Sequence, residues 1–247
     1  MINSLEGKIE ILNNWIQKSK NIVFFGGAGV STESGIPDFR SEDGLYHQQY
    51  RYPPETILSH SFFMDNPEEF YHFYKVKMNA LQYKPNIVHE KLAELEKAGK
   101  LSTIITQNID GLHQKAGSKV VYELHGSIYR NHCMKCHTSY DANSVFNSSS
   151  IVPCCSCGGI IKPDVVLYEE ALDEDILESS ISAISKAYIL IIGGTSLSVY
   201  PANALIRYYY GNKLIVINKT PTYMDIHANL FIQEKLGNVF SHIVLKE

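Results

Sequence analysis

Short apolar runs alternate with helical segments along most of this chain, and this alternation limits the possible folds more than any other feature. The runs cover residues 21–25, 101–106, 120–124, 188–192 and 213–217. Because they are apolar on nearly every residue, they predict strands buried on both faces, as in a parallel sheet covered by helices. Helical patterns precede several of them, over residues 1–20, 87–98 and 202–210. The order predicts an α/β fold with a Rossmann-like, doubly wound parallel sheet.

Two stretches interrupt this rhythm. Residues 41–84 are rich in Tyr, Phe and His and contain Pro53, Pro54 and Pro67, which is typical of a small helical insertion. Residues 128–162 hold all five cysteines and a polar Asn-Ser-Ser-Ser stretch, with too little apolar content to fold around a core of their own. We therefore expect the sheet domain to consist of residues 1–40, 85–127 and 163–247.

Composition excludes several classes of protein. The 247 residues carry a formal net charge of -4, so the chain lacks the basic footprint of a nucleic-acid-binding protein. No apolar run approaches the roughly 20 residues of a membrane-spanning helix, and the N-terminus does not resemble a secretion signal. The odd number of cysteines, all in one segment, is unlike a secreted disulfide framework. We expect a cytoplasmic protein without membrane or nucleic-acid partners.

The cysteine spacing predicts a metal site. Cys133 and Cys136 form one C-x-x-C pair, and Cys154 and Cys157 form a second pair seventeen residues further on. Two such pairs bring four thiolates to one tetrahedral Zn²⁺, and four protein ligands leave no open position, so the zinc is expected to be structural. Cys155 is then the spare thiol. A zinc ribbon alone also suits a DNA-binding module, so the cluster does not decide function.

A glycine-rich loop, Gly26 to Thr32, follows the first predicted strand. Such a loop lets backbone amides approach a pyrophosphate. However, Thr32 stands where the dinucleotide fingerprint has its third Gly or Ala, and no acidic residue about twenty positions later clearly serves the ribose. By itself the loop is compatible with a nucleotide site or with a mere tight turn.

Four blocks of sequence together resemble the sirtuin family of NAD-dependent protein deacylases. They read GGAGVSTESGIPDFR over residues 26–40, TQNIDGLH over 106–113, ELHG over 123–126 and GGTS over 193–196. They occur in the family's order, span about residues 22–220, and both Cys pairs stand where the family keeps its zinc. The resemblance implies NAD as co-substrate, acetylated-lysine proteins or peptides as partners, and transfer of the acetyl group to ADP-ribose with release of nicotinamide.

The resemblance also assigns the site. His125, after the 120–124 strand, matches the catalytic base, and a neutral histidine near pH 7 suits deprotonation of a ribose hydroxyl. Asn108 is the second catalytic residue, because its amide can bind a ribose hydroxyl or a held water. The residues expected to bind NAD are Ala28, Gly29, Thr32, Asp38, Phe39, Arg40, Gln107, Asn108, Ile109, Asp110, His125, Gly194, Thr195, Ser196 and Asn218.

Several of these residues have a specific expected contact. Asp110 accepts from the nicotinamide carboxamide and Ile109 packs beside that ring. Phe39 shields the reacting ribose from water and Arg40 faces phosphate. Asn218 holds the adenine ribose, in place of the acid missing from the fingerprint.

The segment Lys162–Tyr168 resembles the part of the family that pairs with the substrate backbone by strand addition. Val166 and Tyr168 are expected to line the acyl-lysine tunnel. The family more often has Phe-Gly-Glu where this chain has Tyr-Glu-Glu at 168–170, which leaves peptide selectivity open.

The acyl group is expected to be acetyl or another neutral acyl. Members that prefer succinyl or malonyl lysine carry Tyr-x-x-Arg in the helical insertion, and here that stretch corresponds to Tyr71–Tyr74, with Tyr in place of Arg. Arg51, Lys75 or Lys77 could offer a substitute charge.

Three alternative functions stay open: a mono-ADP-ribosyltransferase on the same scaffold, a deacylase of other acyl-lysines, and a catalytically silent zinc-ribbon module that binds NAD or protein. Presence of both Asn108 and His125 favours the deacetylase.

Overall fold

A six-stranded, wholly parallel sheet forms the centre of the fold in the computed structural model, which describes residues 4–38 and 51–245. Its strands run in the order β3-β2-β1-β7-β8-β9. They are β1 (Ile22–Gly26), β2 (Leu101–Thr106), β3 (Val121–Glu123), β7 (Ile189–Gly193), β8 (Leu214–Ile217) and β9 (Leu230–Ile232). The chain order reverses between β1 and β7, which confirms the doubly wound sheet. Ligands of such sheets bind at this switch point, beyond the carboxyl ends of the strands.

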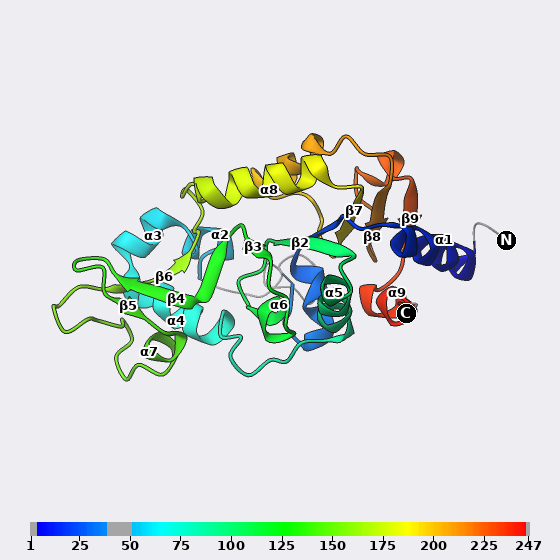
Figure 1. The fold of residues 1–247 in the computed structure, drawn as a ribbon. Coiled ribbons are helices and arrows are strands. Elements are labelled where there is room, and N and C mark those ends of the chain that lie inside the picture. The colour runs from blue at the N-terminus through cyan, green and yellow to red at the C-terminus, as the bar shows by residue number, and fades with distance from the viewer. Residues whose placement is uncertain (1–3, 39–50, 246–247) are drawn as a thin grey trace.

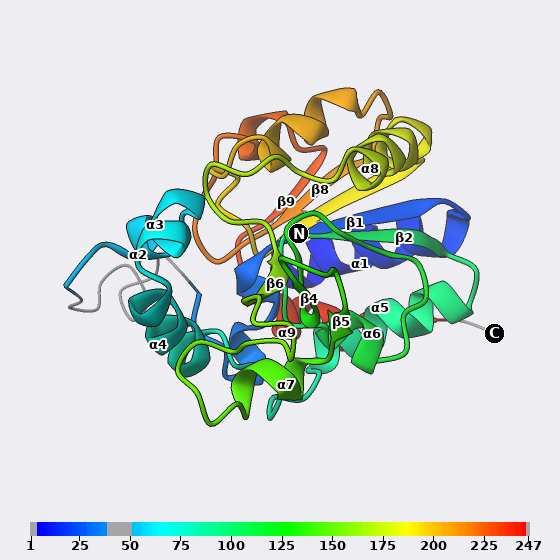
Figure 2. The same ribbon diagram turned by 90° about the vertical axis from the view of Figure 1, so that its left-hand side faces the viewer.

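Helices cover both faces of the sheet (Figures 1 and 2). One face carries α1 (Leu5–Lys18), α5 (Ile87–Lys97), α6 (Leu112–Lys115) and α9 (Leu236–Ser241), and the other carries α8 (Glu174–Lys186) and the 3₁₀ helix η4 (Ala202–Tyr208). The short 3₁₀ turns are η1 (Ala28–Val30), η2 (Thr32–Ser34) and η5 (Asp225–His227). The sequence predicts an ordinary helix over 202–210, but Ala204 N donates to the carbonyl of Pro201, only three residues back, so the segment winds as a 3₁₀ helix instead.

The two helical layers explain why the strands read as continuous apolar runs. In β1 every residue is buried, and consecutive side chains pack in different hydrophobic cores. Phe24 packs in the core under α1 and α5, whereas Phe25 packs in the core under α8 and η4. Because neighbouring side chains of a strand point to opposite faces, a strand between two helical layers has no polar position.

A smaller module lies beside the large sheet (Figure 1). It contains a three-stranded antiparallel sheet of β5 (Ser139–Tyr140), β4 (Gly126–Cys133) and β6 (Ile161–Val165), with α7 (Ala142–Phe146). Next to it stand α2 (Pro54–Ile57), α3 (His60–Asp65) and α4 (Pro67–Lys77).

One hydrophobic core joins the cysteine-rich segment to the helical insertion. Phe70 and Tyr74 of α4 pack in the same cluster as Ile128, Phe146 and Ile161. The rings of Tyr74 and Phe146 stack with their centroids 5.4 Å apart. The cysteine-rich segment thus buries its few apolar side chains against α2–α4, which is why it needs no core of its own.

None of the helices in the described part of the chain is long and apolar enough to cross a membrane.

Candidate functional site

A cavity of about 1110 Å³ opens beyond the carboxyl ends of β1, β2, β7 and β8, at the switch point of the sheet. This volume is slightly above the roughly 300–1,000 Å³ typical of small-molecule sites. Most of the residues predicted to form the site line it: Ala28, Gly29, Thr32, Asp38, Gln107, Asn108, Ile109, Asp110, His125, Val166, Tyr168, Gly194, Thr195, Ser196 and Asn218. Phe39 and Arg40 lie outside the described residues. Segments far apart in the sequence are therefore brought to one hollow, large enough to take a dinucleotide together with an acyl-lysine side chain.

The floor of the cavity forms where two glycine loops touch. Gly29 N donates to the carbonyl of Gly194 over 2.8 Å. A Cβ on Gly29 would lie 2.8 Å from Gly194 Cα, and one on Gly194 would lie 2.6 Å from Val30 N. Gly194 also has φ +62°, which L side chains rarely adopt. The loops after β1 and β7 can come this close only as glycines, and they leave an open cradle of the kind that suits a phosphate.

Ser31 ties the residues after β2 to the glycine loop, although the sequence did not single it out. Its Oγ donates to Asp110 Oδ2 over 2.7 Å and accepts from Asn108 Nδ2 over 3.1 Å. His89 Nε2 lies 3.5 Å from the same oxygen. Ser31 stands inside the GGAGVSTESG block, which is the one signal that could have pointed to it.

Burial governs the charge of Asp110. Burial raises the pKa of its carboxyl, while hydrogen bonds from Leu112 N and the Ser31 hydroxyl act in the opposite direction. The Ser31 hydrogen bonds fix the orientation of both Asn108 and Asp110.

His125 is held as one tautomer. Its Nδ1 lies 2.9 Å from the carbonyl oxygen of Gln107. Because a carbonyl can only accept, Nδ1 must carry the proton of the neutral ring, which leaves the lone pair on Nε2. The backbone of His125 is also held in place, since Val166 N donates to the carbonyl of His125 over 3.0 Å. His125 thus has the form of a base, and its backbone is tied to the predicted substrate segment.

Asn218, which the sequence predicts to hold the adenine ribose, is hydrogen-bonded to the loop after β7. Asn218 lines the cavity, but its amide is bonded to the backbone of Thr195 at both ends: Oδ1 accepts from Thr195 N over 3.2 Å and Nδ2 donates to Thr195 O over 3.0 Å. Thr195 Oγ1 in turn accepts from Leu197 N over 3.2 Å. Asn218 therefore shapes the loop after β7, and the ribose contact expected for it stays a prediction.

Lys162 and Glu170 hold the predicted substrate segment in shape. Lys162 Nζ donates to Glu170 Oε2 over 3.1 Å and to the carbonyls of Pro163 and Val165. The same carboxylate accepts from Leu167 N over 2.9 Å. These contacts lower the pKa of Glu170 although burial alone would raise it. The partly buried ion pair fixes the chain between β6 and Glu170, where Val166 and Tyr168 line the cavity.

Four cysteines gather in the small module as a metal site requires. They are Cys133, Cys136, Cys155 and Cys157, whose sulfurs all lie within 4.8 Å of one another. Three of the Sγ–Sγ distances are 3.4–3.5 Å. Tetrahedral ligands at about 2.3 Å from Zn²⁺ would stand roughly 3.8 Å apart, so the cluster fits one zinc ion after a small expansion.

The cluster contains Cys155, whereas the spacing predicts its neighbour Cys154 as a ligand; the assignment of Cys154 stays a prediction. Cys154 forms an antiparallel bridge with Ile160, and Cys155 N donates to Gly159 O over 2.8 Å. In such extended backbone, consecutive side chains point to opposite sides. Cys154 is exposed, with its thiol 3.6 Å from the carbonyl of Val152, whereas Cys155 is buried facing the cluster.

Comparison with known proteins agrees with this geometry. A model described as the Sir2 family matches residues 27–201. The chain belongs to the Sir2 family. A relative from Clostridium acetobutylicum named NAD-dependent protein deacetylase is 57% identical over 240 residues, which cover 96% of this chain and 98% of the relative. One of the same name from Clostridium perfringens is 55% identical over 97% of this chain and 100% of its own length.

Solved Sir2 family structures share the fold over nearly the whole chain. One, described as Sir2 bound to acetylated peptide, has a TM-score of 0.85 and 37% identity, covering 95% of this chain and 96% of its own. Another, described as Sir2Tm bound to a propionylated peptide, has a TM-score of 0.85 and 38% identity, covering 96% and 97%.

The Tyr71–Tyr74 stretch, which is predicted to correspond to the Tyr-x-x-Arg of family members that prefer succinyl or malonyl lysine, offers no bidentate cation. Both tyrosines are fully buried; Tyr71 OH donates to the carbonyl of Ile161, and Tyr74 OH has no hydrogen-bond partner among the described residues. Of the cations that could substitute, Lys75 donates to the carbonyls at 148 and 150, and Arg51 lies over the Tyr52 ring. Lys77 does line the cavity.

The pH dependence of this Sir2 family member should show a base that stays neutral in mildly acidic solution. Burial lowers the pKa of His125 below 6.5, although the hydrogen bond to the Gln107 carbonyl acts in the opposite direction. A base works when it is unprotonated, so a lowered pKa extends the active range downward. We expect kcat/KM to fall on the acidic side with a midpoint below pH 6.5. A steady-state pH profile with an acidic midpoint at or above 6.5 would contradict this assignment.

Proposed function

We propose that this chain is an NAD-dependent protein-lysine deacetylase that moves the acetyl group of an acetyl-lysine onto ADP-ribose and releases nicotinamide. One observation carries the proposal: the switch-point cavity brings the free Nε2 of His125 and the anchored amide of Asn108 together with the glycine cradle and with Val166 and Tyr168. Two relatives with the deacetylase name and the Sir2 structure with an acetylated peptide support it.

Each group of residues is expected to bind a different part of NAD, according to its place in the cavity. The backbone of the glycine loop, Ala28 and Gly29, holds the phosphates, and Thr195 and Ser196 meet the adenosine half of NAD. Asp110 accepts from the nicotinamide carboxamide beside Ile109. Bound NAD supplies the ADP-ribose that receives the acetyl group, with nicotinamide as the leaving group.

His125 then acts on the ribose. Nε2 takes a proton from a ribose hydroxyl, so that the oxygen can receive the acetyl carbon, while the Gln107 carbonyl stabilises the imidazolium through Nδ1. Asn108 orients the ribose hydroxyl or a water with the part of its amide that Ser31 does not use. The acyl-lysine enters past Val166 and Tyr168, whose segment pairs with the peptide backbone. A zinc ion bound by four cysteine sulfurs would have no open coordination position, so it would stabilise the small module and take no part in these steps.

The acyl preference follows from charge. A succinyl carboxylate at the Tyr71–Tyr74 end would be buried against two neutral side chains, which is costly without a cation. We expect kcat/KM for acetyl-lysine peptide to exceed that for the matching succinyl-lysine peptide by at least about 10-fold, which corresponds to about 1.4 kcal/mol. The measurement incubates the protein with NAD and each peptide and identifies the products by mass.

The same experiment separates the alternatives. Formation of O-acetyl-ADP-ribose in step with deacetylated peptide supports the deacetylase. Label passing from NAD onto protein without O-acetyl-ADP-ribose would instead indicate a mono-ADP-ribosyltransferase. Equal turnover of succinyl and acetyl peptides would overturn the acyl preference, and a Lys77→Met variant would then reveal whether that lysine supplies the charge.

We also infer a cytoplasmic location. All five cysteines lie in one segment and four of them are arranged for a metal rather than in disulfide pairs, as is typical of proteins in a reducing compartment.

A further inference from the structure

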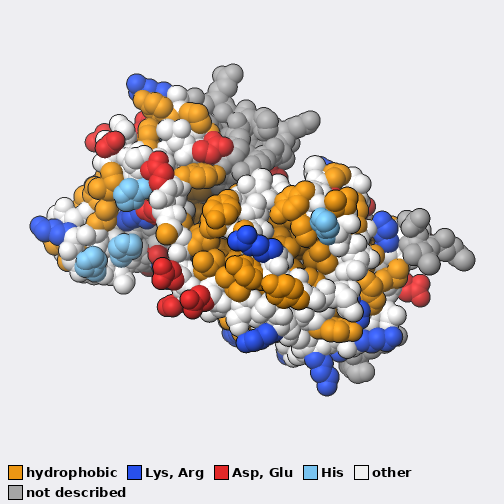
Figure 3. Space-filling model, turned by 90° about the horizontal axis from the view of Figure 1, so that it is seen from above, with side chains coloured by type: hydrophobic (Ala, Val, Ile, Leu, Met, Phe, Trp, Pro, Cys, Tyr) orange, Lys and Arg blue, Asp and Glu red, His pale blue; other side chains and the backbone are white. Residues whose placement is uncertain are grey.

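The chain passes between the large sheet and the small module at two neighbouring places. The small module lies toward one end of the molecule and α1 of the large domain lies at the other (Figures 1 and 3). The first passage runs from the end of β3 through His125 into β4, and the second leaves β6 and carries Val166. The two passages are joined where Val166 N donates to the carbonyl of His125 over 3.0 Å. The predicted base and the predicted substrate segment therefore lie together at the junction of the two parts.

The side chain of Arg130 contacts both passages. Its Nη1 donates to Glu123 Oε2 over 2.7 Å, and its Nε donates to Asp164 Oδ2 over 2.8 Å. Glu123 ends β3 two residues before His125, and Asp164 stands in β6 two residues before Val166. Because a guanidinium is planar and its N–H donors point in fixed directions, it sets the separation of the two carboxylates that it binds.

The two carboxylates differ in burial. The side chain of Glu123 is only 7% exposed, whereas those of Arg130 and Asp164 are about half exposed. A nearly buried carboxylate is costly without a cation beside it, so the contact with Glu123 fixes the guanidinium at the end of β3. The contact with Asp164 is open to solvent and adds little stability. Its effect is therefore on the position of β6 relative to β3.

The backbone of β4 is irregular at the place that carries Arg130. Ser127 pairs with Asp164 and Asn131 pairs with Pro163, so β4 advances by four residues while β6 moves by one. Such bulges redirect side chains and are common beside active sites. This bulge brings the side chain of Arg130 back to Asp164, which pairs with a residue three positions earlier in β4.

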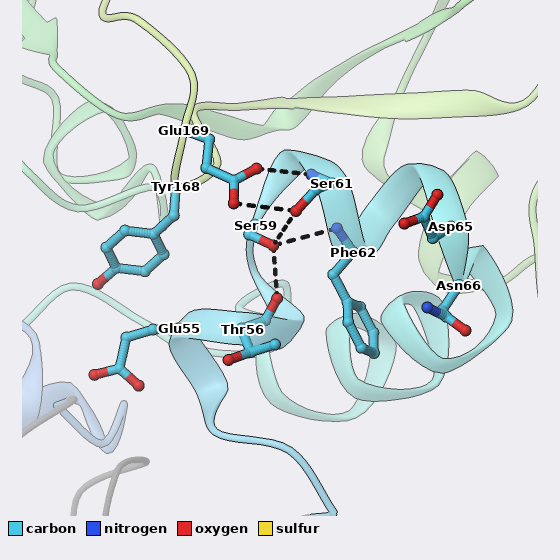
Figure 4. Close-up of a pocket in the computed structure, with 9 residues that line it drawn as sticks. All are labelled: Glu55, Thr56, Ser59, Ser61, Phe62, Asp65, Asn66, Tyr168 and Glu169. Carbon is cyan, nitrogen blue, oxygen red and sulfur yellow. Dashed lines mark hydrogen bonds between the residues drawn. The ribbon is translucent and has the colours of Figure 1, made fainter.

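The far end of the substrate segment is attached elsewhere. Tyr168 N donates to Leu58 O over 2.9 Å, and the carboxylate of Glu169 accepts from Ser61 N over 2.9 Å (Figure 4). These contacts join the segment to the helical insertion. Its near end is joined to the large sheet through Asp164, Arg130 and Glu123. Loss of Arg130 would thus leave the far end of the segment in place and loosen the end beside His125.

We propose that Arg130 is a positioning residue for the deacetylation reaction, because it links Glu123 to Asp164 and so fixes His125 relative to the substrate segment. Among the described residues, Arg130 is not one of those that line the main cavity, so it acts through these neighbours. The inference rests on the proposed function, since it assigns Arg130 to the step that His125 serves.

The first test replaces Arg130 with Met, which keeps a long side chain and removes both hydrogen bonds. We expect kcat for O-acetyl-ADP-ribose formation to fall by about 5- to 20-fold, because small displacements of reacting groups lower the rate strongly. Exchange of labelled nicotinamide into NAD in the presence of acetyl peptide should stay within about twofold of wild type, since it comes before the step of His125. Arg130→Lys keeps the charge without the planar group, so its rate should lie between the two.

A second test asks whether the link acts as one unit. Asp164→Ala breaks it at the exposed end and leaves the pair of Arg130 with Glu123 intact. Because both substitutions break the same link, the double variant Arg130→Met/Asp164→Ala should be about as slow as Arg130→Met alone, whereas independent effects would multiply. Arg207→Met is the matched control: Arg207 is exposed on η4, over the ring of Tyr208, and its loss should leave both activities at the wild-type level.

The outcomes are distinguishable. Deacetylation at the wild-type rate in Arg130→Met would overturn the positioning role, and so would multiplying effects in the double variant. Nicotinamide exchange that falls by the same factor as deacetylation would overturn it too, because Arg130 would then serve only the stability of the fold. If Arg130→Met does not fold, Asp164→Ala and Arg130→Lys are subject to the same comparison of the two activities. Wild-type protein that forms no O-acetyl-ADP-ribose would instead overturn the proposed function.

Discussion

Replacing His125 with Ala should lower kcat/KM for deacetylation by about 100-fold or more, since a positioned general base contributes roughly 10²–10⁴-fold. The variant keeps the glycine cradle and Asn108 but loses the imidazole whose Nδ1 is fixed by the Gln107 carbonyl and whose Nε2 can accept a proton. Formation of O-acetyl-ADP-ribose, followed by mass, is the measurement. Activity within a few fold of wild type would remove His125 from the mechanism.

A second measurement locates the step that His125 serves. In the proposed mechanism, cleavage of the nicotinamide–ribose bond comes before the ribose hydroxyl must lose its proton. We therefore expect the variant to exchange labelled nicotinamide into NAD in the presence of acetyl peptide, although it completes no deacetylation. Loss of both activities would mean that His125 acts in NAD binding or cleavage. His72→Ala, an exposed histidine on α4, is the matched control and should behave as wild type.

The sheet could be predicted from the sequence because its strands lie between two helical layers. A strand such as Ile189–Gly193 has no solvent-facing position, so its apolar run stands out clearly. The carboxyl ends of those strands then located His125 and Asn108. The edge strand β9, Leu230–Ile232, covers three residues only, and a run of that length does not differ from apolar residues in a loop.

What the sequence did not indicate depends on contacts between distant residues. Ser31 is important in the site only because folding places Asp110 and His89 against it, from positions 79 and 58 residues away. Similarly, the pairing of Leu58 with Tyr168 joins the helical insertion to the chain that follows β6, although the two residues are far apart in the sequence. Neither the local spacing of residues nor the hydrophobic periodicity of the sequence predicts these contacts.

The zinc ligands are a third case, and they give the other prediction with a large effect. Spacing alone assigns Cys154, but the direction of the backbone at the bridge to Ile160 turns Cys154 outward and Cys155 inward. We therefore expect Cys155→Ser to lose its zinc almost completely, and Cys154→Ser to keep about one ion per chain. Structural Zn²⁺ contributes about 10–16 kcal/mol of apparent binding free energy in small zinc modules, so the loss of a ligand should be plain in metal analysis and in thermal unfolding.

The effect should extend beyond the metal, because Cys133 and Cys155 belong to the same hydrophobic core as Phe70 and Tyr74 of α4. Loosening that core disturbs the acyl end of the substrate cavity, which Tyr74 lines. We expect deacetylase activity of Cys155→Ser to fall by at least about 10-fold, in proportion to the zinc lost, as is usual when metal binding is coupled to folding. If Cys155→Ser kept its zinc and Cys154→Ser lost it, Cys154 would be the ligand, as the spacing predicts. The side chain of Cys154, not that of Cys155, would then face the metal.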